Sequence, residues 1–210
     1  MTANDYIRSL FVKEDEVQKS IEQGLTERNM PQISVPPEVG QTLYLLAKIS
    51  GAKKILEIGA LGGYSSIWLA KALPLDGKLI SLELKQEHAD FAIENIQKAG
   101  LDQKVSLLVG DASEILDRLE KNGEKFDFFF IDADKLNFVH YVEKAIQLSK
   151  PGAIITLDNL LLGGRILDEA DQNPAPTAVR QVNQMIAQDP RLESMLLTIG
   201  DGLGIARVKE

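Results

Sequence analysis

Polar side chains that can bind a metal ion follow two apolar runs of the sequence. Asp132 comes directly after residues 126–131, and Asp158 and Asn159 come directly after residues 153–157. If both runs are parallel strands of one sheet, their carboxyl ends meet at one edge and bring the three side chains together. Carboxylate and amide oxygens select hard divalent cations, with Mg²⁺ as the first choice and Mn²⁺ or Ca²⁺ as alternatives. The sequence therefore predicts a metal site at this edge.

Lys135 follows Asp132 by three residues and is expected on the same rim. A lysine held beside a reacting hydroxyl is a candidate general base, and its stem is long enough to reach the site. Each residue also has a plainer explanation. Asp and Asn are common where a strand ends in a turn, and Lys135 can be a solvated lysine at the start of a helix. The coincidence of these residues on one rim favours the chemical interpretation.

A glycine-rich segment earlier in the chain has the features of a ligand-binding turn. Residues 54–58 form an apolar run typical of a buried strand, and Gly59, Gly62 and Gly63 follow it. Glycine allows a sharp turn and lets a ligand approach the backbone. Ser65 is placed to cap the helix that follows. Strand, glycine turn and helix N-terminus together indicate the start of a nucleotide-binding βαβ unit.

The spacing of the glycines limits which class of ligand the turn can bind. The dinucleotide fingerprint Gly-x-Gly-x-x-Gly is absent, because Leu61 holds its middle glycine position. Glu57 on the strand can face a ligand ammonium, and Glu83, at the end of the next apolar run, can accept both hydroxyls of a ribose. A ligand that has an ammonium group and a ribose but no phosphate fits S-adenosylmethionine better than NAD. The alternative is a Rossmann turn that only packs a helix.

Composition excludes several classes of function. The chain has 210 residues and a formal charge of −8, which argues against nucleic acid and anionic membranes as partners. It has no cysteine and 2 histidines, so disulfides and a cysteine nucleophile are impossible and a zinc site is poorly supplied. The N-terminal segment has no signal-peptide pattern, and no stretch approaches membrane-spanning length. We therefore expect a cytoplasmic location.

The order of the remaining elements predicts an α/β fold. After two N-terminal helical stretches, 1–28 and about 39–49, apolar strand patterns alternate with amphipathic helix patterns. Strands are expected at 54–58, 78–83, 104–109, 126–131, 153–157, 194–199 and 203–208. Helices are expected at 65–73, 86–99, 112–121, 135–149 and 177–188.

This alternation indicates a Rossmann-like, doubly wound, mostly parallel seven-stranded sheet. We expect an antiparallel C-terminal strand, because 200–202 reads as a hairpin turn between the last two strands. Residues 1–210 are expected to form one domain, with N-terminal helices over 1–50 and the cofactor-binding core over 51–210. The longest polar loop, 163–176, follows the expected metal ligands, and we interpret it as a lid, with a plain surface loop as the alternative.

Taken together, these segments resemble the class I S-adenosylmethionine-dependent methyltransferases. The closer resemblance is to the cation-dependent O-methyltransferase family of caffeoyl-CoA and catechol O-methyltransferases, in its bacterial branch. The matching segments are 56–59, 63–65, 131–135, 158–159, 189–191 and 200–202. The resemblance implies a methyl-transferring enzyme that uses S-adenosylmethionine and a divalent cation.

The resemblance also implies a role for each matching residue. Val35 would touch the cofactor through its backbone, Glu83 would hold the ribose, and Ala112 would hydrogen-bond the adenine edge. The methionine part would be held by Glu57, Gly59, Ala60 and Ser65. The metal would be held by Asp132, Asp158 and Asn159. Asp132 would also lie near the amino-acid end of the cofactor, and Asp132 and Lys135 would be the catalytic pair.

The implied acceptor is a small hydroxylated aromatic molecule, catechol-like or hydroxycinnamoyl-like, and the implied assembly is a homodimer. Residues 158–164 lack the aromatic residue and the following Asn that plant enzymes often carry, and Leu136 and Phe138 replace a more polar Asp and Tyr. These departures argue against the acyl-CoA substrate of the plant enzymes and favour membership of the bacterial branch. Two other functions remain open at this stage: a dinucleotide-dependent oxidoreductase and a non-catalytic methyltransferase-like module.

Overall fold

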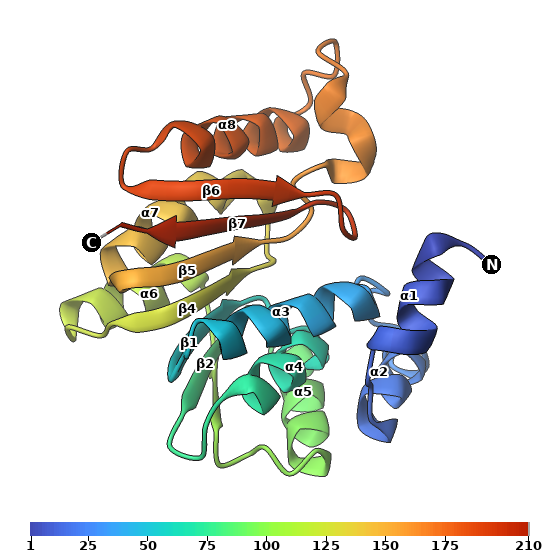
Figure 1. The fold of residues 1–210 in the computed structure, drawn as a ribbon. Coiled ribbons are helices and arrows are strands. Elements are labelled where there is room, and N and C mark those ends of the chain that lie inside the picture. Colours follow the sequence, from blue (N-terminus) through green and yellow to red (C-terminus); the bar gives the residue numbers. More distant parts are fainter. Residues whose placement is uncertain (210) are drawn as a thin grey trace.

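The fold is built on one seven-stranded sheet, seen in the computed structural model, which describes residues 1–209 (Figure 1). The strands are β1 (Lys54–Ile58), β2 (Lys78–Glu83), β3 (Val105–Val109), β4 (Phe126–Ile131), β5 (Ser149–Leu157), β6 (Leu192–Leu197) and β7 (Leu203–Val208). Their order across the sheet is β3-β2-β1-β4-β5-β7-β6. Strands β1 to β5 pair in parallel, and β7 runs antiparallel between β5 and β6. The predicted α/β class, the seven strands and the antiparallel C-terminal strand are confirmed.

Eight α-helices and two short 3₁₀ segments join these strands within residues 1–209. The α-helices are α1 (Ala3–Phe11), α2 (Glu16–Glu27), α3 (Pro37–Ile49), α4 (Tyr64–Ala72), α5 (Gln86–Lys98), α6 (Ala112–Lys121), α7 (Phe138–Leu148) and α8 (Pro174–Gln188). The 3₁₀ segments are η1 (Lys135–Asn137) and η2 (Leu162–Leu167). None of the helices in the described part of the chain is long and apolar enough to cross a membrane.

The helices bury the sheet on both faces, because the central strands carry apolar side chains on both faces. Along β4, Phe129 and Ile131 pack with α6, α7 and α8, whereas Phe128 and Phe130 pack with α2, α3, α4 and α5. All four side chains are fully buried. A strand buried on both faces is typical of a parallel sheet covered by crossover helices. This packing holds the strand ends, and the polar residues that follow them, in fixed positions.

Two local predictions are wrong. Residues 1–28 form two helices rather than one, because Asp15 accepts a hydrogen bond from the backbone N–H of Gln18 and starts α2 with a capping box. Ser65 does not cap α4. Gly63, with φ of 81°, holds the cap position, and the Ser65 hydroxyl donates to Glu57 instead. The sequence pattern shows where polar residues lie but not which neighbour their hydrogen bonds reach.

The turn after β1 packs closely against the residue that follows β4. Gly59 has φ of 100°, and its N–H donates to the carbonyl oxygen of Leu82 at 2.9 Å. A Cβ at Gly59 would lie 2.0 Å from the carbonyl oxygen of Asp132. Only glycine fits at such a distance. The glycine predicted from the turn pattern therefore brings the end of β1 within contact of Asp132.

Candidate active site

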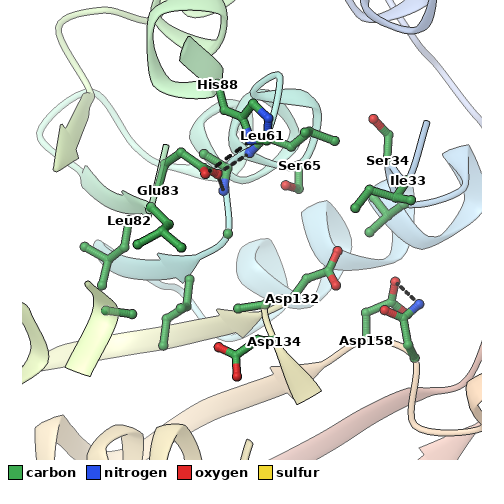
Figure 2. Close-up of a pocket in the computed structure, with 18 of the residues that line it drawn as sticks. Ile33, Ser34, Leu61, Ser65, Leu82, Glu83, His88, Asp132, Asp134 and Asp158 are labelled. Atoms are coloured by element: carbon green, nitrogen blue, oxygen red, sulfur yellow. Dashed lines mark hydrogen bonds and ion pairs between the residues drawn. The ribbon is translucent and has the colours of Figure 1, made fainter. Parts of the chain in front are cut away.

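One cavity of about 730 Å³ opens along the carboxyl ends of the parallel strands (Figure 2). Each of the five parallel strands leads to a residue that lines it: Gly59 after β1, Glu83 at the end of β2, Asp111 after β3, Asp132 after β4 and Asp158 after β5. Ligands of open α/β sheets bind at this edge. The glycine turn and the predicted metal ligands therefore line the same cavity.

Most of the residues predicted to hold the cofactor line this cavity. They are Val35, Gly59, Ala60, Ser65, Glu83, Ala112 and Asp132. Their positions follow from the fold, because each lies on the 30–37 loop, on the turn after β1, at the end of β2 or β4, or in the first turn of α4 or α6. The structure thus brings this set together, while the binding role of each residue stays a prediction.

Glu57 is the exception, because it is wholly buried behind the cavity wall. Its carboxylate accepts hydrogen bonds from the hydroxyls of Ser65 at 2.6 Å, Ser81 at 2.5 Å and Ser66. Burial raises the pKa of this carboxyl, and the three hydroxyls oppose that shift. In this structure the carboxylate of Glu57 faces these serines and does not line the cavity, and its role toward a ligand stays a prediction. Glu57 orients Ser65, which does line the cavity.

Glu83 ties the end of β2 to the glycine turn. Its Oε2 accepts hydrogen bonds from the backbone N–H groups of Leu61 at 2.8 Å and Ala60 at 3.2 Å, and Oε1 accepts from that of Lys85 at 3.0 Å. His88 also lines the cavity, with Nδ1 3.3 Å from Oε1 of Glu83. His88 is not among the predicted site residues, and its place in the first turn of α5, just after β2, is the signal that could have indicated it. A carboxylate held by three backbone donors is a rigid acceptor at the wall.

The predicted metal ligands and Lys135 form one hydrogen-bonded group. Lys135 Nζ donates to Oδ1 of Asn159 at 2.7 Å and to Oδ1 of Asp132 at 3.2 Å. Asn159 Nδ2 donates to Oδ2 of Asp158 at 3.3 Å. Asn159 has φ of 61°, a conformation that Asn adopts more readily than most residues. The ends of β4 and β5 thus place two carboxylates, an amide and an ammonium within contact, as the sequence predicts.

Negative charge is concentrated at this group. Burial raises the pKa of both Asp132 and Asp158, the latter to about 6, and the charge of Asp132 adds to the shift at Asp158. The ammonium of Lys135 opposes both shifts. Oδ1 of Asp158 is buried and has no hydrogen-bond partner within residues 1–209. A buried, unpartnered carboxylate oxygen is costly unless a ligand or cation contacts it.

The donor set fits a hard divalent cation. Its oxygens come from two carboxylates and one amide, and Asp158 contributes the unpartnered oxygen. In the described part of the chain, no cluster of three or more His, Cys, Asp or Glu side chains is arranged to hold a metal. Without nitrogen or sulfur ligands the site is unsuited to zinc, and oxygen ligands with coordinated water are typical of Mg²⁺.

Asp201 is a second residue that the sequence analysis did not place in the site. It lies in the turn between β6 and β7 and lines the cavity. Its Oδ1 accepts a hydrogen bond from the N–H of Gly163 at 2.7 Å, and its carbonyl oxygen accepts from the N–H of Leu161 at 2.9 Å. The hairpin pattern was visible in the sequence. Its place beside the metal ligands depends on β7 pairing with β5, which that pattern does not specify.

The site defines a cofactor-dependent enzyme of Rossmann-like fold, and comparison with known proteins identifies the family. Residues 8–209 match the family model described as O-methyltransferase. The chain is 41% identical to a catechol O-methyltransferase of Niastella koreensis over 214 residues, 99% of this chain and 97% of that protein. It is 34% identical to a caffeoyl-CoA O-methyltransferase of Medicago sativa, with 95% and 84% of the two chains covered.

A solved structure agrees with these relatives. The O-methyltransferase of Bacillus cereus, in complex with SAH, superposes with a TM-score of 0.93 at 38% identity, covering 98% of this chain and 96% of that one. The chain belongs to the O-methyltransferase family. It is an enzyme that transfers methyl groups, and the resemblance to class I S-adenosylmethionine-dependent O-methyltransferases is confirmed. No observation favours the dinucleotide-dependent or non-catalytic alternative.

The charge of Asp158 is expected to cost stability. Its folded-state pKa of about 6 lies above that of an unfolded aspartate, so its contribution stabilises the fold at low pH and is lost as the pH rises through about 6. Asp158→Asn cannot ionise. At pH 8 in EDTA we expect it to raise the free energy of unfolding by roughly 1–3 kcal/mol. Denaturant unfolding at pH 8 and pH 4 measures this, and the gain should disappear at pH 4.

The matched control is Asp127→Asn. Burial opposes the shift, but Lys150 and the backbone N–H groups of Lys53 and Lys54 hold the pKa of Asp127 below its ordinary value. That carboxylate stabilises the fold once it is ionised, so the control should lose stability at pH 8. Loss of stability at pH 8 in Asp158→Asn as well would contradict the electrostatic description of the site.

Proposed function

We propose that this enzyme transfers the methyl group of S-adenosylmethionine to a hydroxyl of a catechol-like or hydroxycinnamoyl-like molecule, with a divalent cation. One observation carries the proposal. The residues predicted for the methyl donor and those predicted for the cation line the same cavity, and Asp132 belongs to both sets. The relatives named catechol O-methyltransferase and caffeoyl-CoA O-methyltransferase support this class of acceptor.

For the donor, we assign the glycine-turn half of the cavity. Ser65, held by Glu57, and the backbone of Gly59 and Ala60 would bind the methionine part. Glu83 would bind the ribose, and the backbone of Ala112 the adenine edge. The SAH complex of the Bacillus cereus enzyme supports a ligand of this kind.

For the cation, we assign Asp132, Asp158 and Asn159. A divalent cation bound there would lower the pKa of two adjacent acceptor hydroxyls and fix their orientation. The protein itself prepares this site by burying Asp158 with one oxygen unpartnered and by holding Asn159 in the left-handed conformation. The cation, Mg²⁺ above Mn²⁺ or Ca²⁺, is part of the proposal.

The reaction is an in-line displacement, in which an acceptor oxygen attacks the methyl carbon as the carbon–sulfur bond breaks. The cavity holds the two reactants together, which can supply a large part of the rate acceleration. Phenols ionise near pH ~10, so a base must remove the acceptor proton at neutral pH. Lys135 Nζ lies between Asp132 and Asn159, and after releasing its own ammonium proton to water it would take that proton.

We also propose a homodimer. Helix α1 has no buried residue and packs mainly on α3, where Arg8 pairs with Glu38 at 2.6 Å. Its apolar side chains are widely exposed, 54% for Tyr6, 49% for Leu10 and 63% for Phe11. A second copy of the chain covering this face would remove that surface from water. Sedimentation velocity that shows a monomer at micromolar concentration would reject this.

The proposed function is tested by a methyl-transfer screen. The purified enzyme is incubated with S-adenosylmethionine and catechols, hydroxycinnamates or their thioesters, with Mg²⁺ or with excess EDTA. We expect methylated product with Mg²⁺ and at least about a hundredfold slower turnover in EDTA, since positioning and ionisation of the acceptor both depend on the cation. Restoration by added Mg²⁺ is the control. Full activity in EDTA, or no product from any vicinal diphenol, would reject the proposal.

The role of Lys135 has a separate test. Lys135→Met keeps an apolar stem and removes the amine, and we expect kcat to fall roughly 10²–10⁴-fold on an ordinary catechol. Affinity for S-adenosylmethionine, measured by calorimetry, should barely change, because the proposed donor contacts come from strands β1 to β3 and from Asp132, which the substitution keeps. A nitrocatechol ionises without a base, so kcat on this acceptor should fall much less. Equal losses on both acceptors would mean that Lys135 positions the substrate and is not the base.

A further inference from the structure

Lys135 bonds the same oxygens that a metal ion would need. Its Nζ donates to Oδ1 of Asn159 at 2.7 Å and to Oδ1 of Asp132 at 3.2 Å, and both residues belong to the three that we assign to the cation. Its charge also opposes the raised pKa of Asp158, the third of them. Among the lining residues that the structure describes, Lys135 is the one lysine or arginine. The ammonium of Lys135 is therefore the counterion of this site.

The surroundings of Lys135 hold its ammonium in this place. The residue opens η1, whose cap is Asp134, and its side chain is only 17% exposed. Nζ also lies 4.6 Å from the centre of the ring of Phe138, which is fully buried. The face of an aromatic ring attracts a cation at this distance. Lys135 is thus part of the built site and not a solvated lysine at the start of a helix.

A divalent cation cannot share these oxygens with the ammonium without a loss of affinity. Mg²⁺ lies about 2.1 Å from its oxygen ligands. Because Nζ is 2.7 Å from Oδ1 of Asn159, a cation on that oxygen would lie within about 5 Å of Nζ. At this distance the repulsion between a divalent and a univalent cation weakens binding roughly fifteenfold even at the dielectric constant of water, and more where water is partly excluded. Tight binding of the metal therefore requires the ammonium to move away.

We propose that Lys135 is the resident cation of the metal-free site, and that a divalent cation must displace it from Asp132 and Asn159. The inference rests on the proposed function and gives Lys135 a second task within it. The lysine stem is flexible, so Nζ can leave the two oxygens and turn toward an acceptor hydroxyl while it stays near the ring of Phe138. Binding of the metal would then free the amine that takes the acceptor proton.

Binding of Mn²⁺ measures this competition without any turnover. The enzyme is stripped with EDTA, desalted and titrated with Mn²⁺ at neutral pH, with neither donor nor acceptor present, and the free ion is measured by electron paramagnetic resonance. Lys135→Met removes the amine and keeps an apolar stem. Because the competing charge is gone, we expect the dissociation constant of Mn²⁺ to be at least about tenfold lower than in the parent enzyme. Lys135→Gln, which is neutral and keeps a donor, has the same expected direction and replaces the methionine variant if that one does not fold.

Lys144→Met is the matched control. The side chain of Lys144 is 15% exposed, close to the 17% of Lys135, and it pairs with Asp117 at 2.5 Å and with Glu120 at 2.7 Å on α6. The substitution removes the same charge and breaks two ion pairs, but it touches none of the assigned metal ligands. The dissociation constant of Mn²⁺ should therefore change less than about threefold, since a distant exposed charge is screened.

Thermal unfolding separates competition from a merely structural role of the lysine. In EDTA, Lys135→Met leaves the buried carboxylate of Asp132 without its ammonium partner, so the variant should melt roughly 3–8 °C below the parent. Saturating Mn²⁺ replaces the missing charge and should raise the variant at least to the melting temperature of the parent in EDTA. Lys144→Met should show the same loss in EDTA and in Mn²⁺.

The outcomes separate this inference from the function on which it rests. If the parent binds Mn²⁺ and Lys135→Met binds it equally or more weakly, the inference is overturned, and the cation site and the methyl transfer remain. A melting temperature that Mn²⁺ does not restore in the variant overturns the inference as well. If neither the parent nor the variant binds Mn²⁺, the cation part of the proposed function fails, and the inference fails with it.

Discussion

Parallel strands end at the same edge of a sheet, and this constraint decides where the chemistry of the molecule can lie. The helices on both faces bury most of β1 and β4 and the C-terminal part of β5, so polar residues on these strands reach solvent mainly near the ends. Gly59 then allows the turn after β1 to touch the backbone of Asp132. As a result, groups separated by about a hundred residues of sequence share one cavity. The residues that we propose for the methyl donor and for its acceptor lie close together because the strands that carry them are neighbours.

The site concentrates buried charge, which is a cost to the fold. Glu57, Asp132 and Asp158 all have raised pKa values, and burial is the largest cause for each. Three hydroxyls compensate Glu57, and Lys135 compensates Asp132, but one oxygen of Asp158 has no partner in the described chain. Residues that are poorly satisfied by the protein alone are typical of sites that must bind a ligand. The least satisfied group in this site is the one that we assign to the cation.

Much of this arrangement could be predicted from the sequence, because it depends on local patterns. Apolar runs predict the strands, and the residue types after 131 and 157 predict the group of Asp132, Lys135, Asp158 and Asn159. These predictions succeed because the end of a strand fixes the position of the next few residues. The same reasoning places Glu83 at the cavity wall, since it ends β2.

Contacts between elements that are distant in the sequence could not be predicted, because no local pattern specifies them. Glu57 lies on a strand and was expected to face a ligand, but three serines, two of them on α4, draw its carboxylate behind the wall. Asp201 enters the site because β7 inserts beside β5, a pairing that depends on the whole sheet.

The central claim is that a divalent cation and the methyl donor bind side by side at the ends of β4 and β5. The most direct measurement is a crystal structure with S-adenosylhomocysteine, a nitrocatechol and Mn²⁺, using the anomalous signal of the metal. The account predicts an anomalous peak about 2.0–2.3 Å from oxygens of Asp132, Asp158 and Asn159, with the catechol oxygens completing the coordination. A catechol bound beside the donor with no metal peak at these three residues would contradict it.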